Sequence, residues 1–175
     1  MQDIRRIVVP VDFHRHTDTV ADYAHFVATR LGAGVVFVHV VQSLARSLTA
    51  TDLSATVYGD LFPAAFVEID ADLLKLARER MQELVERYRA HLTDCAGEVI
   101  EGDPADRIVA FAAEHQADLI VMGTHGARGI EKILLGSVAE RVLKRAACPV
   151  VIVNPYRGEQ GYRITRSPGE AAPSA

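Results

Sequence analysis

Cysteine is scarce in this sequence: the chain of 175 residues holds only Cys95 and Cys148. The two stand alone, without a CxxC pair or any other spacing typical of metal ligands. A disulfide framework and a zinc site are therefore disfavoured, and we expect two reduced, buried thiols.

Long hydrophobic runs and clusters of basic residues are also missing. No apolar segment approaches the length of a membrane span, and the apolar stretch after Arg5 and Arg6 ends before Asp12, too soon for a signal-peptide core. The net charge is −4 and the basic residues are spread along the chain, so nothing marks a surface for nucleic acid or anionic lipid. We expect no nucleic-acid partner, no membrane partner and a cytoplasmic location.

The motifs of efficient phosphoryl-transfer enzymes are absent as well. The sequence contains no Gly-x-x-x-x-Gly-Lys-Ser/Thr loop, no protein-kinase signature set and no metal-ligating constellation. His14 and His16 could pair around a metal, but an exposed polar turn is the simpler interpretation. We therefore predict no catalytic residue and no metal held by the protein's own side chains.

What the chain does contain is an alternation of strand-like and helix-like segments, typical of a parallel sheet with helices on both faces. The expected strands cover residues 7–11, 35–41, 98–101, 119–122 and 149–153. With 49% hydrophobic residues the chain can form one good core. We predict a single α/β domain over residues 1–154, a long connection over residues 43–66 and a disordered tail over residues 155–175.

Cap residues and periodicity place the expected helices. One begins at a cap formed by Thr17 or Asp18 and ends at Gly32, and another opens with Asp103 as cap and Pro104 in its first turn. A long helix over residues 69–92 has a periodic apolar face that should point to the core: Leu73, Ala77, Met81, Leu84, Tyr88 and Leu92.

A glycine-rich segment follows the fourth expected strand. Gly123 and Gly126 let the backbone turn and approach a ligand without an intervening side chain. Gly136 comes next, and Ser137 with Glu140 matches the capping box of a helix start. The unpaired N–H groups of a helix start suit a phosphate. These residues could serve only as turn and cap residues, but their joint spacing favours a phosphate site.

This spacing resembles the nucleotide-binding signature of the universal stress protein family: glycine, two residues, glycine, nine residues, then glycine followed by serine or threonine. The resemblance covers residues 3–154 apart from a loop near residues 43–66. It implies a Rossmann-like fold, with a doubly wound, five-stranded parallel sheet of order 3-2-1-4-5. Ligands of such sheets bind at the carboxyl ends of the strands, where the strand order reverses, here between the first and fourth strands.

The first two expected strands would hold the nucleoside. Asp12 follows Pro10 and Val11 as in the family's first-strand signature, and a carboxylate there suits ribose hydroxyls. Asp12 could instead be only a turn or cap residue for the next helix. His39 and Val40 match the family's histidine–valine pair, which implies that the backbone of Val40 binds adenine, whereas His39 is better explained as a hydrogen-bonded core residue.

Motif and resemblance together predict a Mg-ATP site, with ADP or AMP as alternative ligands. The expected binding residues are Pro10, Val11, Asp12, Val40, Met122, Gly123, Gly126, Arg128, Gly136, Ser137 and Val138. Arg128, His125 or Lys132 could supply positive charge to the phosphates. The family implies a nucleotide-dependent sensor or signalling module in stress responses, with at most slow ATP hydrolysis or autophosphorylation. The alternatives are a partner-binding or structural homodimer, and a module that prefers AMP or cyclic AMP.

The last expected strand forms an apolar sheet edge made of Val150, Val151, Ile152 and Val153. Unpaired apolar edges invite another chain. The resemblance implies antiparallel pairing with the same strand of a second copy, in a two-fold homodimer. The alternative is that the chain's own tail covers this edge. A different protein partner is also possible, and the sequence does not identify it.

Overall fold

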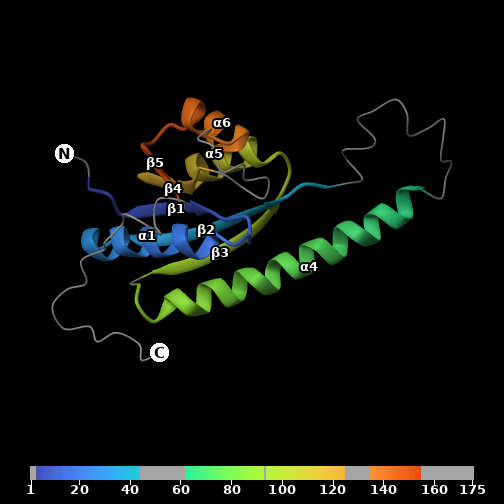
Figure 1. Cartoon of the computed structure of the whole chain (residues 1–175), viewed down its shortest axis with the longest axis horizontal. Coiled ribbons are helices and arrows are strands. Elements are labelled where there is room, and N and C mark those ends of the chain that lie inside the picture. Colours follow the sequence, from blue (N-terminus) through green and yellow to red (C-terminus); the bar gives the residue numbers. More distant parts are fainter. Residues whose placement is uncertain (1–2, 44–61, 93, 125–134, 155–175) are drawn as a thin grey trace.

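A five-stranded, all-parallel sheet forms the centre of the computed structural model, which describes residues 3–43, 62–92, 94–124 and 135–154. Its strands are β1 (Arg6–Pro10), β2 (Gly34–Val41), β3 (Cys95–Glu101), β4 (Leu119–Gly123) and β5 (Val150–Val153). The spatial order is β3-β2-β1-β4-β5, so the sheet order that the family resemblance implied is confirmed (Figure 1). β3 begins three residues earlier than expected, since Cys95 already pairs with Val35.

Four helices in the described part of the chain cover the two faces of this sheet. They are α1 (Thr17–Leu31), α4 (Phe62–Arg89), α5 (Pro104–Glu114) and α6 (Ser137–Arg145). α1 and α4 pack on one face and α5 and α6 on the other, which gives the doubly wound arrangement (Figure 1). Each pair of helices closes a separate hydrophobic cluster against the sheet, called here the α1/α4 core and the α5/α6 core.

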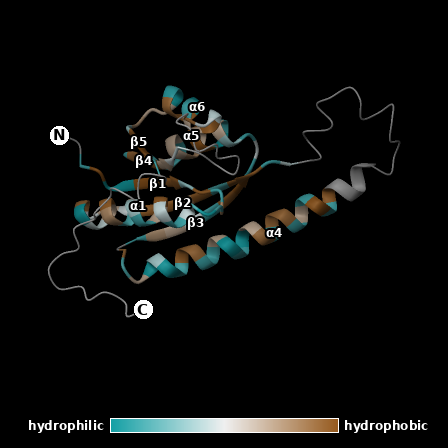
Figure 2. Cartoon of the chain, in the orientation of Figure 1, coloured by the Kyte–Doolittle hydropathy of each residue, from teal (hydrophilic) through white to brown (hydrophobic). Residues whose placement is uncertain are grey.

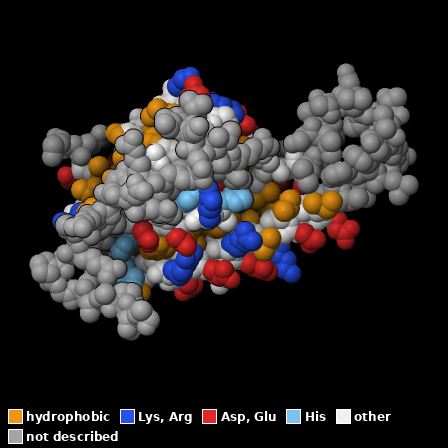
Figure 3. Space-filling view, viewed as in Figure 1, with side chains coloured by type: hydrophobic (Ala, Val, Ile, Leu, Met, Phe, Trp, Pro, Cys, Tyr) orange, Lys and Arg blue, Asp and Glu red, His pale blue; other side chains and the backbone are white. Residues whose placement is uncertain are grey.

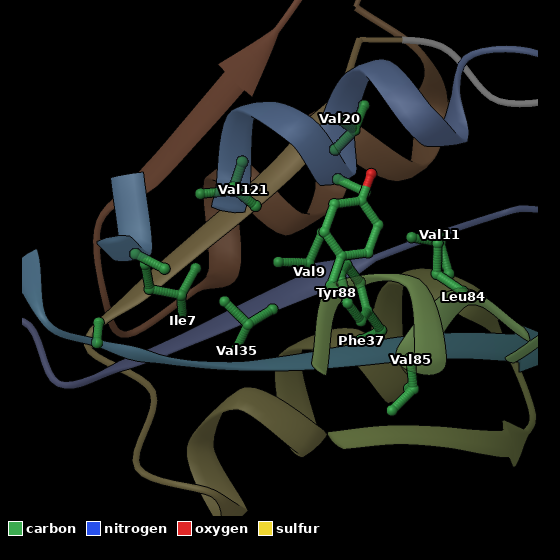
Figure 4. Packing of buried hydrophobic residues seen from close by; sticks show 14 of the residues in the cluster. Ile7, Val9, Val11, Val20, Val35, Phe37, Leu84, Val85, Tyr88 and Val121 are labelled. Atoms are coloured by element: carbon green, nitrogen blue, oxygen red, sulfur yellow. The ribbon is translucent and has the colours of Figure 1, made fainter. Parts of the chain in front are cut away.

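The α1/α4 core is built around large side chains of the sheet that meet α4. The rings of Phe37 and Tyr88 lie with their centroids 5.6 Å apart, and Phe37 and Leu84 are completely buried. Figure 4 shows Val9 and Val121 of the sheet among the side chains that α1 and α4 direct towards it. Val8, Ile120, Phe111 and Val142 form the centre of the α5/α6 core.

α4 is longer than the sequence suggested. It begins at Phe62 rather than near Ile69, so the expected connection over residues 43–66 is wrong at its end, while residues 44–61 lie outside the described part. Its first half extends beyond the sheet in Figure 1 and carries the hydrophobic patches of Figure 2. Leu73, expected in the core, is 40% exposed there, whereas Ala77, Met81, Leu84 and Tyr88 are buried as predicted.

Two glycines permit close packing at the sheet. Gly97 lies under α4, where an added Cβ would stand 2.5 Å from Sδ of Met81 and 2.6 Å from Cγ2 of Val85. Gly102 follows β3 with φ +139°, a backbone conformation that favours glycine. Together they let α4 lie close to β3 and let the chain turn from β3 into α5.

The helix caps agree only in part with the predictions. Gly32 ends α1 in the left-handed conformation and Asp103 caps α5, both as expected. The N-cap of α1 is His16, so neither Thr17 nor Asp18 holds that position. Both cysteines are free, as predicted, but each is half-buried rather than buried, and burial raises the pKa of both thiols.

Candidate functional site

The chain leaves β1 and β4 in opposite directions, and in a doubly wound sheet this arrangement defines a crevice at the carboxyl ends of the strands. The two strands are neighbours in the sheet, yet β1 continues into α1 on one face and β4 leads to α6 on the other. This divergence is the topological switch point of a doubly wound sheet, and ligands of such folds bind there. Asp12, Gly123 and Gly136, which the sequence singled out, lie at the ends of the elements that meet there.

Asp12 follows the end of β1. Its Oδ1 accepts hydrogen bonds from the backbone N–H of His14, at 3.1 Å, and from Oγ1 of Thr17, at 3.3 Å. The carboxylate thus holds the turn into α1, which is the alternative role that the sequence left open. Asp12 is only half-buried, so the residue is partly accessible to solvent.

Val40 directs its backbone towards the crevice. The N–H of Val11 donates to the carbonyl of Val38 at 2.9 Å, and the N–H of Gly102 donates to the carbonyl of Val41 at 3.1 Å. Backbone groups of alternate residues in a strand point to the same side, so those of Val40 point, like those of Val38, towards β1. Because β1 ends at Pro10, the N–H and C=O of Val40 emerge beyond its end, where an adenine edge would find one donor and one acceptor.

His39 is fixed beside this position. Its Nδ1 lies 2.7 Å from the carbonyl oxygen of Val11, which can only accept, so Nδ1 carries the proton. The ring packs on Phe13 with centroids 4.6 Å apart. Burial lowers the pKa of His39, and the positive charges of Arg80 and His14 lower it further, against the raising effects of the Val11 carbonyl and Asp12. His39 is therefore a neutral, hydrogen-bonded residue of the fold, as the sequence suggested.

The start of α6 forms the opposite wall of the crevice. The N–H of Gly136 donates to the carbonyl of Thr124 at 2.7 Å, and the N–H of Thr124 donates to the carbonyl of Val153 at 2.9 Å. These bonds hold the helix start against the carboxyl ends of β4 and β5. The first helical bond within α6 runs from the N–H of Glu140 to the carbonyl of Gly136.

The predicted capping box is not formed. Gly136 is the N-cap, no side chain caps the helix, and Glu140 accepts a hydrogen bond from Lys144 at 2.6 Å instead. Ser137 is therefore the first helical residue. Since the backbone N–H groups of residues 137–139 precede the first helical bond, the start of α6 offers donors and the positive end of its dipole to an anion.

The remaining predicted residues divide into three groups. Val11 and Met122 are buried, so their side chains belong to the cores and only their backbone could reach a ligand. Pro10, Gly123 and Val138 are half-buried at the crevice. Gly126 and Arg128, with His125 and Lys132, lie outside the described residues.

Sequence reasoning missed a group of charged residues that joins α5 to α6. Arg141 donates to Asp103 at 2.9 Å and to Asp106 at 2.7 Å, and Arg145 also bonds to Asp106. The arginines stand four residues apart on α6 and the aspartates three residues apart on α5, which places each pair on one helix face. That spacing was the only signal available from the sequence.

Two further properties concern the described residues as a whole. They contain no helix long and apolar enough to cross a membrane. Within the same ranges, no group of three or more histidine, cysteine, aspartate or glutamate side chains is arranged to hold a metal ion.

The sheet is doubly wound in the order β3-β2-β1-β4-β5, and its switch point lies where β1 and β4 lead to helices on opposite faces. These features define a class of α/β proteins that bind ligands at the switch point. The family model of the universal stress protein family matches residues 3–154. The universal stress protein MJ0531 of Methanocaldococcus jannaschii is 36% identical over 159 residues, which cover 89% of this chain and 85% of that protein. The chain therefore belongs to the universal stress protein family.

Solved structures share the fold. The universal stress protein UspA from Lactobacillus plantarum superposes with a TM-score of 0.73 at 20% identity, covering 88% of this chain and all of that one (100%). The universal stress protein from Archaeoglobus fulgidus, solved in complex with dAMP, gives a TM-score of 0.57 at 25% identity, covering 87% of this chain and 100% of that one.

Proposed function

We propose that this protein binds an adenine nucleotide in the crevice between β1 and β4, with Mg-ATP as the ligand, and acts as a nucleotide-dependent sensor or signalling module in a stress response. The observation that carries the proposal is the uncapped start of α6, tied through Gly136 to the end of β4. Three backbone donors at a dipole's positive end suit phosphate oxygens. The Archaeoglobus fulgidus relative with bound dAMP supports the choice of an adenine ligand.

Each part of the nucleotide has a proposed partner. The N–H and C=O of Val40 would pair with the adenine edge, and the Asp12 carboxylate would accept from ribose hydroxyls. The backbone of Gly123, Gly136, Ser137 and Val138 would surround the phosphates. Pro10, Val11 and Met122 would line the site through backbone and packing, and Gly126 and Arg128 stay predictions from the sequence motif.

The proposal assigns no catalytic residue. Backbone donors bind a phosphate in its ground state, and fast hydrolysis would need a base or a metal-holding side chain as well. Slow ATP turnover or autophosphorylation would be compatible with such a site. A protein that binds a nucleotide tightly without consuming it is suited to report its level.

Preference for a monophosphate is the second candidate. The dAMP complex of the Archaeoglobus fulgidus relative favours it, because that ligand carries a single phosphate. AMP and cyclic AMP would use the same contacts to adenine and ribose but fewer donors of α6. Comparing ATP, ADP, AMP and cyclic AMP on one protein sample decides between the two.

Thermal unfolding with each nucleotide tests the proposal. A ligand at 100 times its Kd stabilises the folded state by about 2.7 kcal/mol, which for a chain of this length raises Tm by roughly 5–10 °C. Gly123→Val and Asp12→Asn should reduce the rise with ATP. Asp18→Asn is the matched control for Asp12→Asn, because it removes the same charge from the ion pair of Asp18 with Arg87 on α1 and α4. No rise with any nucleotide, in protein shown to be free of bound ligand, would rule the proposal out.

We also propose a homodimer in which β5 pairs with β5 of a second copy. Among the described residues, β5 is an edge strand that pairs only with β4, and Val150, Val151 and Ile152 are half-buried. Val151→Lys should shift the sedimenting species from dimer to monomer at micromolar concentration. Leu143→Lys, an equal change at an exposed position of α6, is the control and should leave the dimer intact. A monomeric wild-type protein would exclude the dimer.

A further inference from the structure

Four charged side chains form a bridge between the two helices of the α5/α6 layer. Arg141 reaches Oδ2 of Asp103 at 2.9 Å and Oδ1 of Asp106 at 2.7 Å, and Arg145 bonds to the same Oδ1 of Asp106. These residues are called here the α5–α6 ion-pair network. Figure 3 shows basic and acidic side chains gathered at the upper edge of the molecule, where Figure 1 places α6.

Asp103 is held on both of its carboxylate oxygens. Oδ1 accepts from the N–H of Asp106 at 3.0 Å and caps α5, while Oδ2 accepts from Arg141. The hydrogen bond from Arg141 is the main cause of the lowered pKa of Asp103, and the N–H of Asp106 lowers it further. Asp103 therefore caps α5 and also binds an arginine of α6, so its carboxylate links the two helices directly.

The other contacts of α6 with the layer beneath it are apolar and involve few of its side chains. Of its nine residues, only Ala139 and Val142 are buried, and Leu143 is 48% exposed. Val138 also packs, partly buried, against the α5/α6 core, and apolar contacts of this kind are non-directional. The hydrogen bond from Gly136 to Thr124 fixes its first turn at one point, and the network fixes the direction of its axis from the other end.

We propose that the α5–α6 ion-pair network positions the start of α6 for the nucleotide's phosphates, so that Asp106 and Arg141 are positioning residues for phosphate binding. This inference rests on the proposed function. Both side chains are engaged with each other, so they act through the orientation of the helix and not by touching the ligand. Backbone donors have steep distance and angle dependence, so a small rotation of α6 weakens their bonds to phosphate. It leaves the nucleoside contacts on β1 and β2 unchanged.

Two substitutions that change the net charge in opposite directions distinguish a positioning role of the network from a purely electrostatic effect on the ligand. Asp106→Asn removes a negative charge and Arg141→Gln removes a positive one, and both break the network. If the network positions α6, both variants weaken Mg-ATP binding, roughly five- to tenfold, the loss expected for one charge-assisted hydrogen bond. If only the long-range field matters, Asp106→Asn tightens ATP binding and Arg141→Gln weakens it.

Calorimetric titration with Mg-ATP and with adenosine gives the decisive measurement. Adenosine has no phosphate, so its Kd should change less than twofold in either variant. Lys144→Gln is the matched control: it removes a positive charge from the same helix, but Lys144 pairs with Glu140 within α6 and not with the aspartates of the network. The Kd of Lys144→Gln for Mg-ATP should stay within about twofold of the wild-type value, because salt screens the electrostatic effect of a single exposed charge.

Hydrogen exchange of the apo variants provides a test that needs no nucleotide. The amides of residues 140–142 should exchange faster in Asp106→Asn and Arg141→Gln than in the wild type or Lys144→Gln. Opposite changes in ATP affinity, equal losses of ATP and adenosine, or unchanged exchange would each overturn the positioning role. If the wild type binds ATP and both variants bind it equally well, the proposed function stands and the positioning role is refuted.

Discussion

Replacing Gly97 with alanine should destabilise the protein through a single packing conflict. Gly97 lies in β3 directly beneath α4, and its pairing partner in β2 is the buried Phe37. A Cβ built there stands 2.5 Å from Sδ of Met81 and 2.6 Å from Cγ2 of Val85, and the backbone has no positive φ that alanine would strain. The conflict is therefore purely one of side-chain volume.

The magnitude follows from which neighbour can move. Met81 can turn its flexible thioether away, but Val85 is β-branched and stiff within a helix, so α4 itself must shift by several tenths of an ångström. Overpacking of this kind costs about 1–3 kcal/mol. Alanine regains roughly 0.4–1 kcal/mol by restricting the unfolded chain. We expect a net loss of about 1–2 kcal/mol in the free energy of unfolding, which lowers Tm by roughly 2–8 °C.

Urea denaturation of Gly97→Ala, Val85→Ala and the double variant measures this conflict as a coupling energy. Val85→Ala removes the methyl group that the new Cβ would meet, so the double variant should be more stable than the sum of the single changes predicts, by about 1 kcal/mol. Additive effects, or a Gly97→Ala protein as stable as the wild type, would show that α4 does not lie as close to β3 as the structure places it.

Two other predictions concern polar groups in the α1/α4 layer. The hydroxyl of Tyr88 donates to Oδ1 of Asp22 at 2.6 Å, and burial together with this bond raises the pKa of Tyr88. Tyr88→Phe should lower the free energy of unfolding, measured in urea, by about 1 kcal/mol, because a hydrogen bond usually contributes about 1 ± 0.5 kcal/mol. A loss below about 0.3 kcal/mol would contradict this prediction. Burial lowers the pKa of His39 below its ordinary value of 6.5, so the unfolded chain binds a proton there more readily than the folded one. Its contribution to stability is therefore full above pH 6.5 and falls as the pH drops below that value through the folded pKa. In His39→Gln the decline of Tm between about pH 7.5 and 5.5 should be shallower than in the wild type, and equal slopes would assign the decline to other groups.

Four strands, β1, β2, β4 and β5, were predictable because they are short apolar runs bounded by glycine, proline or aspartate, whereas β3 carries two glutamates and its start was missed. The strand order came from the family resemblance and not from periodicity, since sequence pattern alone does not determine which strands are neighbours. The start of α4 was missed although Pro63, the second residue of that helix, is a typical first-turn signal. Val67, in the part of the helix that was missed, is an apolar residue with 61% exposure and gives no sign of a helix packed on one face.

The cap of α6 shows why local patterns can be off by one residue. Ser137 and Glu140 have the spacing of a capping box, but the pattern does not include the bond from Gly136 to Thr124. That bond holds Gly136 in an extended conformation, φ −62° and ψ 153°, which makes it the N-cap and moves Ser137 into the helix. The difference favours anion binding, because a serine cap would have occupied one of the donors.

Contacts between distant residues could not be predicted from the sequence. Arg141 and Asp103 are 38 residues apart, and β4 and the glycine-rich segment lie between them. They meet because α5 and α6 cover the same face of the sheet, on the side opposite α1. Phe13 and His39 meet for a similar reason, since β1 and β2 are paired and both end at the crevice.

The same topology explains how one ligand would connect two separate cores. Asp12 holds the turn from β1 into α1, a helix of the α1/α4 core, whereas Gly136 begins a helix that is anchored in the α5/α6 core. In the proposed binding mode, the nucleoside contacts the first layer and the phosphates contact the second. Loss of the terminal phosphates would then release α6 while the nucleoside stays bound. A signal that depends on ATP rather than AMP would appear as a change in the position of α6 and of the ion pairs that hold it to α5.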